Sequence, residues 1–507
     1  MVSIVIIAIL ALGAFELFTS LLHSAIVTQR QAVASTLATN QMEYLKSLPY
    51  DNLAVAGGAI YSTTTIPAKF TKTIEGDKYT VTTSITYADD SYDGCGSYPN
   101  QALKQQYCRN YPPPSGAPST DGNPGDYKDV NVSVTDISGS NLASLDSQIA
   151  ALVAETASNT GALFVKVVDD SGNPISGVTV TATNSSIAPT VNVSDTTDEN
   201  GLVIFYDLPP STSGYKYVVS ASLTGYSSLT TIAPSGALQP TYSSQNLIAQ
   251  SSSYVTLTLR PQGANSLVIE TTDLNGTALP GVKVYVKGGY KKYTSAGDTS
   301  YYYDNLTPSD TRPTTDSNGL AAIVNLVPGN YIFCGDVGAT SCAIGGTTYY
   351  LAAAVPYGGN NPIQPINVPS YDPSNPPATT FAYNGVNYLQ KVRLMLTTNS
   401  SYPRVGSITP YDGSIASGVL SSFAFTLTGT NLPCTANAGS CNTHVSFKQG
   451  SNTFTASCTG SAAGLQLNCT VNLSSAVSGN TQLIVNVGSN TLTLPAAPLL
   501  GGIIVTP

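Results

Sequence analysis

The chain has 507 residues but no tryptophan, three methionines and only two histidines, His23 and His444. Histidine is the most common general base, and a Ser-His-Asp or Cys-His site needs one beside its nucleophile. Neither histidine stands near a plausible nucleophile, and no phosphate-binding loop, HExxH sequence or nucleophile elbow occurs. The sequence therefore predicts a protein that is not an enzyme and uses no cofactor.

Charge is the second scarce property, because only 10% of the residues are Asp, Glu, Lys or Arg. The net charge is −9 and the 20 lysines and arginines form no cluster, so the basic patch typical of nucleic-acid binding is missing. The acidic residues Asp89, Asp90 and Asp93 lie in a turn-rich polar stretch. They are expected to form a solvated loop rather than an acid/base site.

What the chain has in quantity is Thr, Ser, Val and Tyr, together with 44 glycines and 32 prolines. This composition is typical of short strands joined by turns, and 42% hydrophobic content argues against a disordered chain. Single cores rarely grow past about 250 residues, so we expect three to five domains of roughly 100 residues. The predicted fold class is mainly β.

Eight cysteines occur as four pairs of near neighbours. No CxxC is present and the histidines are far apart, so zinc and thioredoxin-like redox chemistry have little support. Disulfides in an oxidising compartment explain the cysteines better, and an even number per predicted domain favours bridges within domains. We expect local pairs, with crossing among the last four left open: Cys95 and Cys108, Cys334 and Cys342, Cys434 and Cys441, Cys458 and Cys469.

The first fifteen residues carry no charge, and the apolar run continues past Glu16 to Leu22. About 20 apolar residues suffice to cross a bilayer, so residues 1–22 are expected to be able to span one. Apolar residues then recur at helical spacing, and Pro49 is expected to end the helix after Ser47. A basic segment like that of a cleaved secretory signal is absent, so the chain is expected to begin at a processed end.

This N-terminus, the sequence ATNQMEYLKSLPYDNL and the β-rich remainder resemble a mature type IV pilin or minor pilin over residues 1–53. The resemblance implies a subunit that is cut by a prepilin peptidase and held in the inner membrane by its helix. Pilus assembly machinery then packs it helix against helix. An apolar helix suits lipid before assembly and a dry fibre core afterwards. The assembly helix would use Met1, Val5, Ile9, Leu12, Glu16, Leu17 and Leu21.

Two positions depart from the pilin pattern. Val5 stands where most members have a glutamate thought to pair with a neighbour's N-terminal amine, and Leu22 stands where many have a proline. Glu16 is the only acidic residue before Glu43, and in a fibre core it has to be neutral, paired or close to water. It either finds a partner, such as His23 or an N-terminal amine, or lies near the membrane surface without a specific role.

Residues 54–155 are predicted to form a pilin-like head. Apolar and polar residues alternate within KFTKTIEGDKYTVTTSITYADD and within DYKDVNVSVTDIS, which indicates two or more antiparallel strands. The turn-rich segment between them holds Cys95 and Cys108. Pilins often carry such a disulfide-bounded loop, though usually nearer the C-terminus.

An internal repeat follows the head. GALFVKVVDDSGNPISGVTVTATNS aligns with NSLVIETTDLNGTALPGVKVYVKGG, and TTDENGLVIFYDLPP aligns with TTDSNGLAAIVNLVPGNYIF. Both copies, over 161–260 and 265–398, resemble carboxypeptidase regulatory-like (transthyretin-like) β-sandwiches, which implies a spacer or binding role. The TTDxNG sequences lack the further oxygen ligands and closing glutamate of a calcium loop, so hairpin turns are expected.

The second copy is longer because of a Tyr-rich insert. Its tyrosines, Tyr301 to Tyr303, are a candidate surface for adhesion or glycan contact, although packing between subunits is the simpler interpretation. Related sandwiches form Lys–Asn isopeptide bonds, but the closing strands VTLTLR and VRLMLTT lack the asparagine. No such bond is expected.

The last segment, beginning PRVGSITPYDGSIASGVLSSFAFTLTGTNLP, resembles a TIG-type immunoglobulin fold. The predicted architecture is mainly β with one long N-terminal α-helix, a pilin-like α+β head and three tandem Ig-like β-sandwiches. The predicted domains are the helix (1–53), the head (54–155), the two repeats (156–262 and 263–400) and the TIG-type domain (401–507).

The predicted function is a structural subunit of an extracellular type IV pilus-like filament, a homo-oligomer that displays its β-domains for adhesion or motility. The alternative is a low-copy minor pilin or tip adhesin that binds a surface, host or glycan ligand. A membrane-anchored surface enzyme is the third class.

Overall fold

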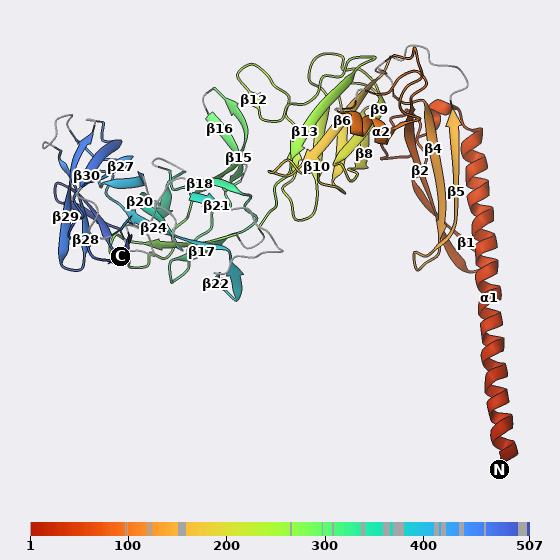
Figure 1. Ribbon diagram of the computed structural model, residues 1–507, viewed down its shortest axis with the longest axis horizontal. Coiled ribbons are helices and arrows are strands. Elements are labelled where there is room, and N and C mark those ends of the chain that lie inside the picture. The colour runs from red at the N-terminus through yellow and green to blue at the C-terminus, as the bar shows by residue number, and fades with distance from the viewer. Residues whose placement is uncertain are drawn as a thin grey trace. The chain divides into compact units, whose positions relative to one another are not determined.

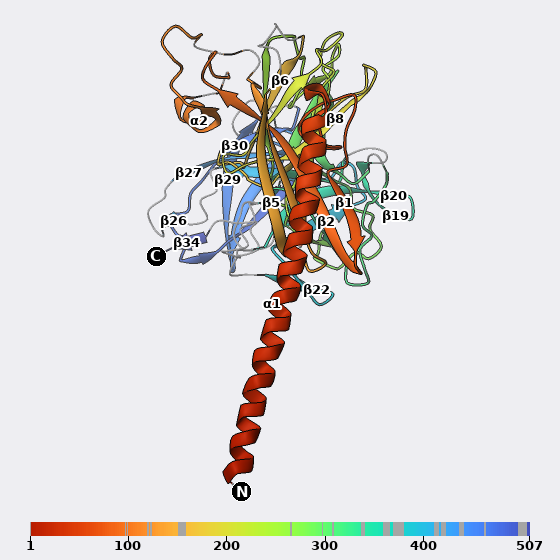
Figure 2. The ribbon, with the colours of Figure 1, turned by 90° about the vertical axis from the view of Figure 1, so that its right-hand side faces the viewer.

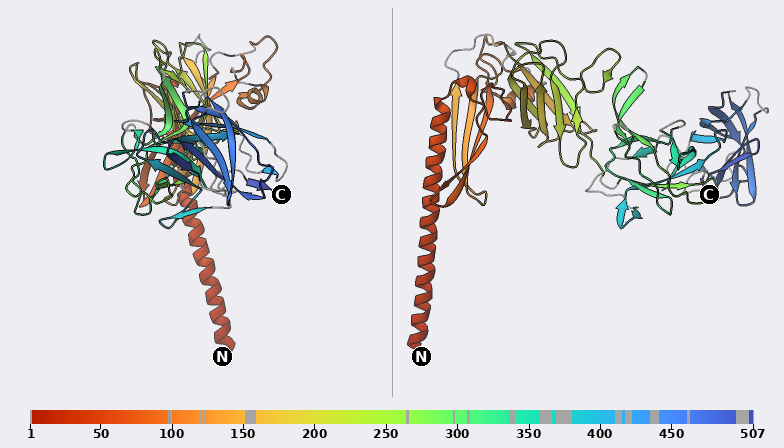
Figure 3. Two further views of the ribbon diagram at one scale, coloured as in Figure 1. Left: turned by 90° about the vertical axis from the view of Figure 1, so that its left-hand side faces the viewer. Right: turned by 180° about the vertical axis from the view of Figure 1, so that it is seen from behind.

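Two compact units make up the chain in the computed structural model, and each is described by itself (Figures 1 and 3). Unit 1 comprises Met1–Thr224, Ser228–Gly236 and Tyr242–Leu259; unit 2 comprises Gly225–Ser227, Ala237–Thr241 and Arg260–Pro507. For residues 2–12, 14, 366–368, 415–416 and 504–506 only the backbone is described. The structure describes residues 2–96, 98, 100–118, 121, 124–150, 159–263, 266–296, 298–306, 309–335, 340–357, 366–368, 380–409, 415–416, 422–434, 441–460, 463–494 and 504–506.

A single long helix, α1 (Val2–Ser47), opens unit 1 and ends two residues before Pro49, as the sequence predicts. Its C-terminal half lies along the head sheet, whereas its N-terminal part extends past the sheet (Figure 2). Five residues at three- or four-residue spacing face the sheet and are at most 7% exposed: Ala34, Leu37, Ala38, Met42 and Leu45. Burial of this stripe explains why one half of the helix is held against the head.

The head sheet has the antiparallel order β1 (Lys69–Ile74), β2 (Asp77–Asp90), β4 (Tyr127–Thr135) and β5 (Asn141–Ala150). Strand β3 (Cys108–Arg109) pairs in parallel with the end of β2. The predicted alternation is confirmed, because one face of β2 and β4 is buried against α1. These core residues are Tyr79, Val81, Ile85, Val130, Val132 and Val134.

The expectation of a solvated acidic loop at residues 89–93 is wrong. Asp89 belongs to β2, is only 2% exposed and accepts a hydrogen bond from Gly96 N at 2.9 Å. Asp93 is half-buried in the turn that follows. The disulfide-closed segment folds back over this end of β2, which the local composition did not indicate. It also contains a second helix, α2 (Gln101–Tyr107).

The first repeat copy, also in unit 1, forms two facing sheets. One has the order β11-β10-β7-β8 and the other β13-β6-β9, with β6 and β13 parallel. The strands are β6 (Gly161–Val168), β7 (Thr179–Asn184), β8 (Val191–Thr196), β9 (Leu202–Leu208), β10 (Val218–Ser222), β11 (Leu229–Thr230) and β13 (Ser252–Thr258).

The second copy, in unit 2, repeats this plan. Its opening strand β14 and closing strand β24 are parallel, as β6 and β13 are in the first copy. One sheet has the order β17-β14-β24-β20-β19 and the other β12-β15-β18-β21, with β16 beside β15. Strand β12 (Gln239–Pro240) comes from the sequence of the first copy but belongs to unit 2 and pairs with β15. The strands of the second copy itself are β14 (Leu267–Thr272), β15 (Val286–Ser295), β16 (Asp298–Asp304), β17 (Leu320–Ile323), β18 (Gly329–Phe333), β19 (Cys342–Ile344), β20 (Thr347–Pro356), β21 (Ile366–Val368), β24 (Gln390–Thr397) and a hairpin of β22 (Phe381–Tyr383) and β23 (Val386–Tyr388).

The described residues of the C-terminal part of unit 2 form two β-sheets. Its larger sheet has the order β25-β27-β30-β29-β28-β32-β33 and its smaller one β26-β34-β31. The core between strands includes Phe425, Phe447 and Leu483. The strands are β25 (Arg404–Thr409), β26 (Ile415–Ala416), β27 (Phe423–Thr430), β28 (Thr443–Gln449), β29 (Asn452–Gly460), β30 (Gln466–Val471), β31 (Gly479–Asn480), β32 (Gln482–Val487), β33 (Asn490–Thr493) and β34 (Ile504–Thr506).

The chain is thus mainly β with one long N-terminal helix, while the exact domain bounds remain a prediction. All four disulfides join neighbours in sequence: Cys95 to Cys108, Cys334 to Cys342, Cys434 to Cys441 and Cys458 to Cys469. Among the residues whose placement is described, no helix is both long and apolar enough to cross a membrane.

Candidate functional site

The first candidate surface is the exposed apolar side of α1 before the helix reaches the head. It consists of Phe15, Leu17, Phe18, Leu21, Leu22 and Ile26, which are between 48% and 67% exposed and which we call the α1 apolar surface. Large apolar side chains gathered in this way are typical of a surface that another protein or a membrane covers. Of the predicted assembly residues, Leu17 and Leu21 lie here, whereas the side chains of Met1, Val5, Ile9 and Leu12 lie outside the described ones.

Glu16 lies in the same stretch of α1 and is itself exposed. Its backbone carbonyl accepts a hydrogen bond from the Thr19 hydroxyl at 2.9 Å. His23 is seven residues further along the helix, which is a rise of about 10 Å, so the structure does not bring the two side chains together within one chain. A cationic partner for the Glu16 carboxylate in a filament could come from a neighbouring molecule.

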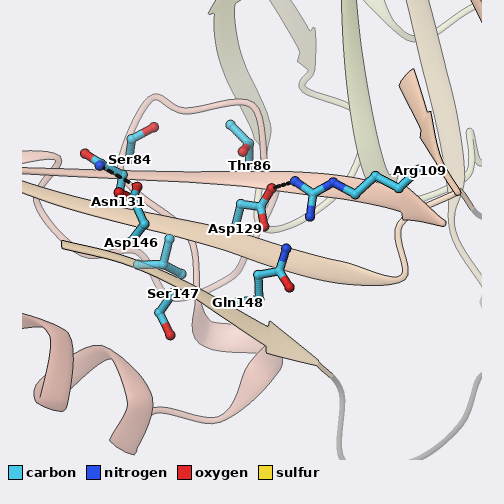
Figure 4. Close-up of a pocket in the computed structure, with 9 residues that line it drawn as sticks. Ser84, Thr86, Arg109, Asp129, Asn131, Asp146, Ser147 and Gln148 are labelled. Carbon is cyan, nitrogen blue, oxygen red and sulfur yellow. Dashed lines mark hydrogen bonds and ion pairs between the residues drawn. The ribbon is translucent and has the colours of Figure 1, made fainter. Parts of the chain in front are cut away.

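The second candidate is a polar groove of about 590 Å³ on the face of the head sheet that points away from α1 (Figure 4). Cross-strand register places Ser84, Asn131 and Asp146 in one row, and Thr86, Asp129 and Gln148 in the next. These positions alternate with the buried ones, so the same pattern that fills the core also lines the groove. We call this set, with Arg109 and Ser147, the head groove.

Arg109 closes one end of the head groove. It comes from β3 and donates a hydrogen bond from Nη2 to the Asp129 carboxylate, as Figure 4 shows. At the other end, Asn131 Nδ2 donates to Asp146 Oδ1 at 2.7 Å and to Ser144 Oγ at 3.0 Å. The lining thus offers hydroxyl, amide, carboxylate and guanidinium groups but no nucleophile–base pair. It suits hydrogen bonding to a polar ligand rather than catalysis.

A buried lysine supports this sheet from its other side. Lys128, 1% exposed, donates from Nζ to Tyr50 O at 2.9 Å and lies 4.4 Å and 5.1 Å from the ring centroids of Tyr50 and Tyr87. Burial lowers the pKa of Lys128 to about 8, because removal from water disfavours the charged form. The sequence analysis did not identify Lys128. Its place in one alternating series with Val130, Val132 and Val134 on β4 would have predicted that its side chain points into the core.

Unit 2 holds a charged cluster on the parallel strands β14 and β24. Glu270 accepts hydrogen bonds from Lys391 Nζ at 3.1 Å, Arg393 Nε at 2.7 Å and Tyr357 Oη at 2.5 Å. Burial alone would raise the pKa of Glu270, but the hydrogen bonds from Arg393 and Tyr357 outweigh it and hold that pKa below its ordinary value. The opening and closing strands of this copy are therefore joined by an ion-pair network.

The TTDxNG sequences are turns in both copies. Asp198 Oδ1 accepts from the backbone N–H of Asn200 at 2.8 Å, and Asp316 Oδ1 does the same for Asn318. Gly201 and Gly319 have φ values of +67° and +71°, which glycine adopts readily. The carboxylates satisfy their own backbone, as expected for a turn.

One acidic group has the spacing of metal ligands. Oxygen atoms of Asp93, Asp121 and Asp126 lie within 4.8 Å of one another. Two of the three carboxylates are half-buried and Asp121 is buried, and no histidine or free thiol joins them among the described residues. We assign no metal to them.

Tyr301, Tyr302 and Tyr303 lie on β16 and are all half-buried. Tyr302 stacks on Tyr290 with ring centroids 5.0 Å apart, and Tyr303 packs edge-on to the fully buried Tyr331. The structure thus uses much of this aromatic surface for packing inside the second repeat copy. It places these tyrosines and the head groove in different units.

No protein-family model and no curated protein matches the chain. Among solved structures, similarity is found to the Bacillus anthracis TIE protein, with 11% identity over 75% of this chain and 58% of that one, at a TM-score of 0.18. A streptococcal ancillary pilin gives 15% identity over 40% of this chain and 65% of that one, at a TM-score of 0.19. The chain thus spans less than two thirds of either protein.

The shaft pilin SpaA from Lactobacillus rhamnosus GG gives 10% identity over 47% of this chain and 99% of that one, at a TM-score of 0.15. Superposition at such low scores carries no argument about this chain's fold or activity. The functional conclusion therefore rests on the chain's own surfaces.

Proposed function

We propose that this chain is a structural subunit of an extracellular, type IV pilus-like filament that polymerises through α1. The observation that carries the proposal is the α1 apolar surface, whose six side chains are 48% to 67% exposed in the single chain. Burying large apolar side chains between neighbouring helices stabilises an assembly by roughly 25 cal/mol per Å² removed from water. The pilin-like sequence over 1–53 supports the same proposal.

Substitution within the α1 apolar surface tests this proposal. The double variant Leu17→Asp/Leu21→Asp places charge where a neighbouring helix would pack, and we expect filament yield after shearing to fall at least about tenfold. The matched control is Ile137→Asp, which changes an apolar residue that is 85% exposed on the head. Normal filaments from the double variant, at equal protein level, would contradict the proposal.

The role of Glu16 is part of the same proposal. If its carboxylate pairs with a neighbour's N-terminal amine or with His23 of another subunit, Glu16→Gln should reduce assembly because an amide forms a weaker bond to a cation. Unchanged filament yield in Glu16→Gln would instead assign Glu16 to a polar boundary.

Before assembly, the proposed subunit is held at the inner membrane and handed to pilus machinery, and it acts without catalysis. Mass spectrometry of sheared filaments tests abundance and N-terminal methylation together. A dominant, N-methylated chain would identify it as the fibre's building block. Hydrolase activity that stays with the purified chain through further purification would contradict the absence of catalysis.

The head groove favours a second candidate function, that of a low-copy minor pilin or tip adhesin. Its hydroxyl, amide and carboxylate groups match the hydrogen-bonding needs of a glycan. Binding of the purified chain to immobilised glycans should weaken in Asn131→Ala and Gln148→Ala, but not in Thr299→Ala on strand β16 of unit 2. Abundance separates the two functions, because an adhesin would be a trace component beside a smaller pilin.

A further inference from the structure

The disulfide-closed loop of the head contains the short helix α2, Gln101–Tyr107. A seven-residue helix is far below the length at which isolated helices persist in water. Asn100 caps it, since its side-chain oxygen accepts from Leu103 N at 2.9 Å, and Cys108 follows its last residue and is bonded to Cys95. The helix therefore depends on the closed loop and on whatever its surface packs against.

That packing partner is the first repeat copy, which lies in the same compact unit. Side chains of the loop and of strands β6 and β9 form one apolar cluster in which the ring of Tyr98 meets Phe164 edge-on, with centroids 5.6 Å apart. Tyr98 also stacks on Tyr107 at 5.6 Å. All core members are at most 9% exposed: Cys95, Tyr98, Leu103, Cys108, Ala162, Phe164, Leu202 and Tyr206. Both sulfur atoms of the bridge thus belong to residues of a shared core.

Polar contacts fix the register of this docking. Asn200 Nδ2 donates to Gln106 Oε1 at 2.8 Å and to the Tyr107 hydroxyl at 3.1 Å. The Tyr107 hydroxyl in turn donates to Asp198. A second contact lies nearby, where the Tyr87 hydroxyl donates to Asp207 on β9. The turn of the first repeat copy therefore binds the last residues of α2 through its side chains.

The second repeat copy serves as an internal comparison. Its turn has the same backbone bonds, because Asp316 Oδ1 accepts from Asn318 N at 2.8 Å and Leu320 N at 2.9 Å. Asn318 is exposed, however, and within the described residues its side chain makes no hydrogen bond. The turn motif alone thus needs no docking partner, and the contacts of Asn200 are an additional feature of the first copy.

We propose that the Cys95–Cys108 bond is a latch that shapes the docking surface for the first repeat copy. With the bond closed, the head and the first copy behave as one body; without it, α2 loses its form and the copy is released from the head. The first copy would then be a fixed part of the head rather than a separately moving spacer. This inference stands independently of the proposed function.

Hydrogen–deuterium exchange on the full chain tests the latch. In Cys95→Ser/Cys108→Ser, we expect backbone amides of residues 198–208 to exchange at least about tenfold faster, because the opposing surface is lost. The matched control is Cys334→Ser/Cys342→Ser, which removes another local bridge, in unit 2, and should leave residues 198–208 unchanged. Faster exchange confined to residues 95–108 would overturn the proposal.

A second variant tests the proposal if Cys95→Ser/Cys108→Ser does not fold. Tyr107→Phe/Asn200→Ala keeps the bridge but removes the polar contacts, and it should speed exchange in both 101–107 and 198–202. Asn318→Ala is its control and should have no effect there. Unchanged exchange in the first of these two variants would show that the loop and the turn are not coupled.

Discussion

Lys128 is a lysine whose side chain is buried in the head, beside the apolar core between α1 and the sheet. In the folded chain its pKa is about 8, against an ordinary value of 10.5. Between these values the unfolded chain binds a proton that the folded chain has released, so this residue makes stability rise with pH. The slope cannot exceed about 1.4 kcal/mol per pH unit for a single group.

Urea unfolding midpoints between pH 8 and 9.5 test the lysine. We expect the wild-type midpoint to rise over this range, and the rise to be smaller in Lys128→Met, which keeps the length of the side chain without its charge. An identical pH slope in both proteins would mean that Lys128 titrates normally.

Two acids at the base of the disulfide loop act in the opposite sense. Burial raises the pKa of Asp89 and of Asp126 to about 7, from an ordinary value of 3.8. Their contribution to stability is fully present below about pH 4 and is lost as pH rises through 7, because the folded chain must give up protons that the unfolded chain has already lost.

We therefore expect the urea unfolding midpoint to fall less between pH 4.5 and 7 in Asp126→Asn than in the wild type. The two midpoints should differ least at pH 4.5. Asp298→Asn, at an exposed position in unit 2, is the matched control. A wild-type midpoint that rises steadily over this pH range would contradict the assignment.

At the scale of elements, α1 and the head strands could be predicted because their periodicity is carried by each segment alone. The spacing of Leu37 and Leu45 and the alternation of Val130, Val132 and Val134 show which side is buried before any partner is known. The TTDxNG sequences likewise predicted the turns that contain Gly201 and Gly319.

Other elements depend on contacts that no local pattern encodes. Helix α2 has only seven residues, too few to show a helical period in the sequence. It is closed off by the Cys95–Cys108 disulfide and packs against the first repeat copy, which follows later in the chain. The head groove arises from the register of β2, β4 and β5, which brings Ser84 beside Asn131 and Asp146. Asp89 looked solvated because the chain that covers it returns from later in the sequence.

The packed face of α1 leads to an element-scale prediction. Leu45 is fully buried against the sheet, so Leu45→Ala should lower the free energy of unfolding by about 2 to 5 kcal/mol through lost contacts and a residual cavity. Its neighbour Tyr44 is 49% exposed, and Tyr44→Ala should change stability by no more than about 0.5 kcal/mol. Chemical denaturation of both variants gives the comparison, and equal losses would mean that the helix packs by a different face.

For the whole molecule, the two compact units each contain their own core. We expect calorimetry of the full chain to resolve at least two transitions. Leu45→Ala should shift the transition of unit 1, and Phe447→Ala, at a fully buried position of the C-terminal core, should shift that of unit 2. A single transition that both variants move equally would show one cooperative body instead.

The disulfides also bear on how the molecule is made. Their partners are separated by 13, 8, 7 and 11 residues, so every bridge closes over a short stretch. As the chain enters an oxidising compartment from its N-terminus, each cysteine meets its native partner before the next domain arrives. Oxidation can therefore proceed from the N-terminus onward without reshuffling and with little dependence on disulfide isomerases.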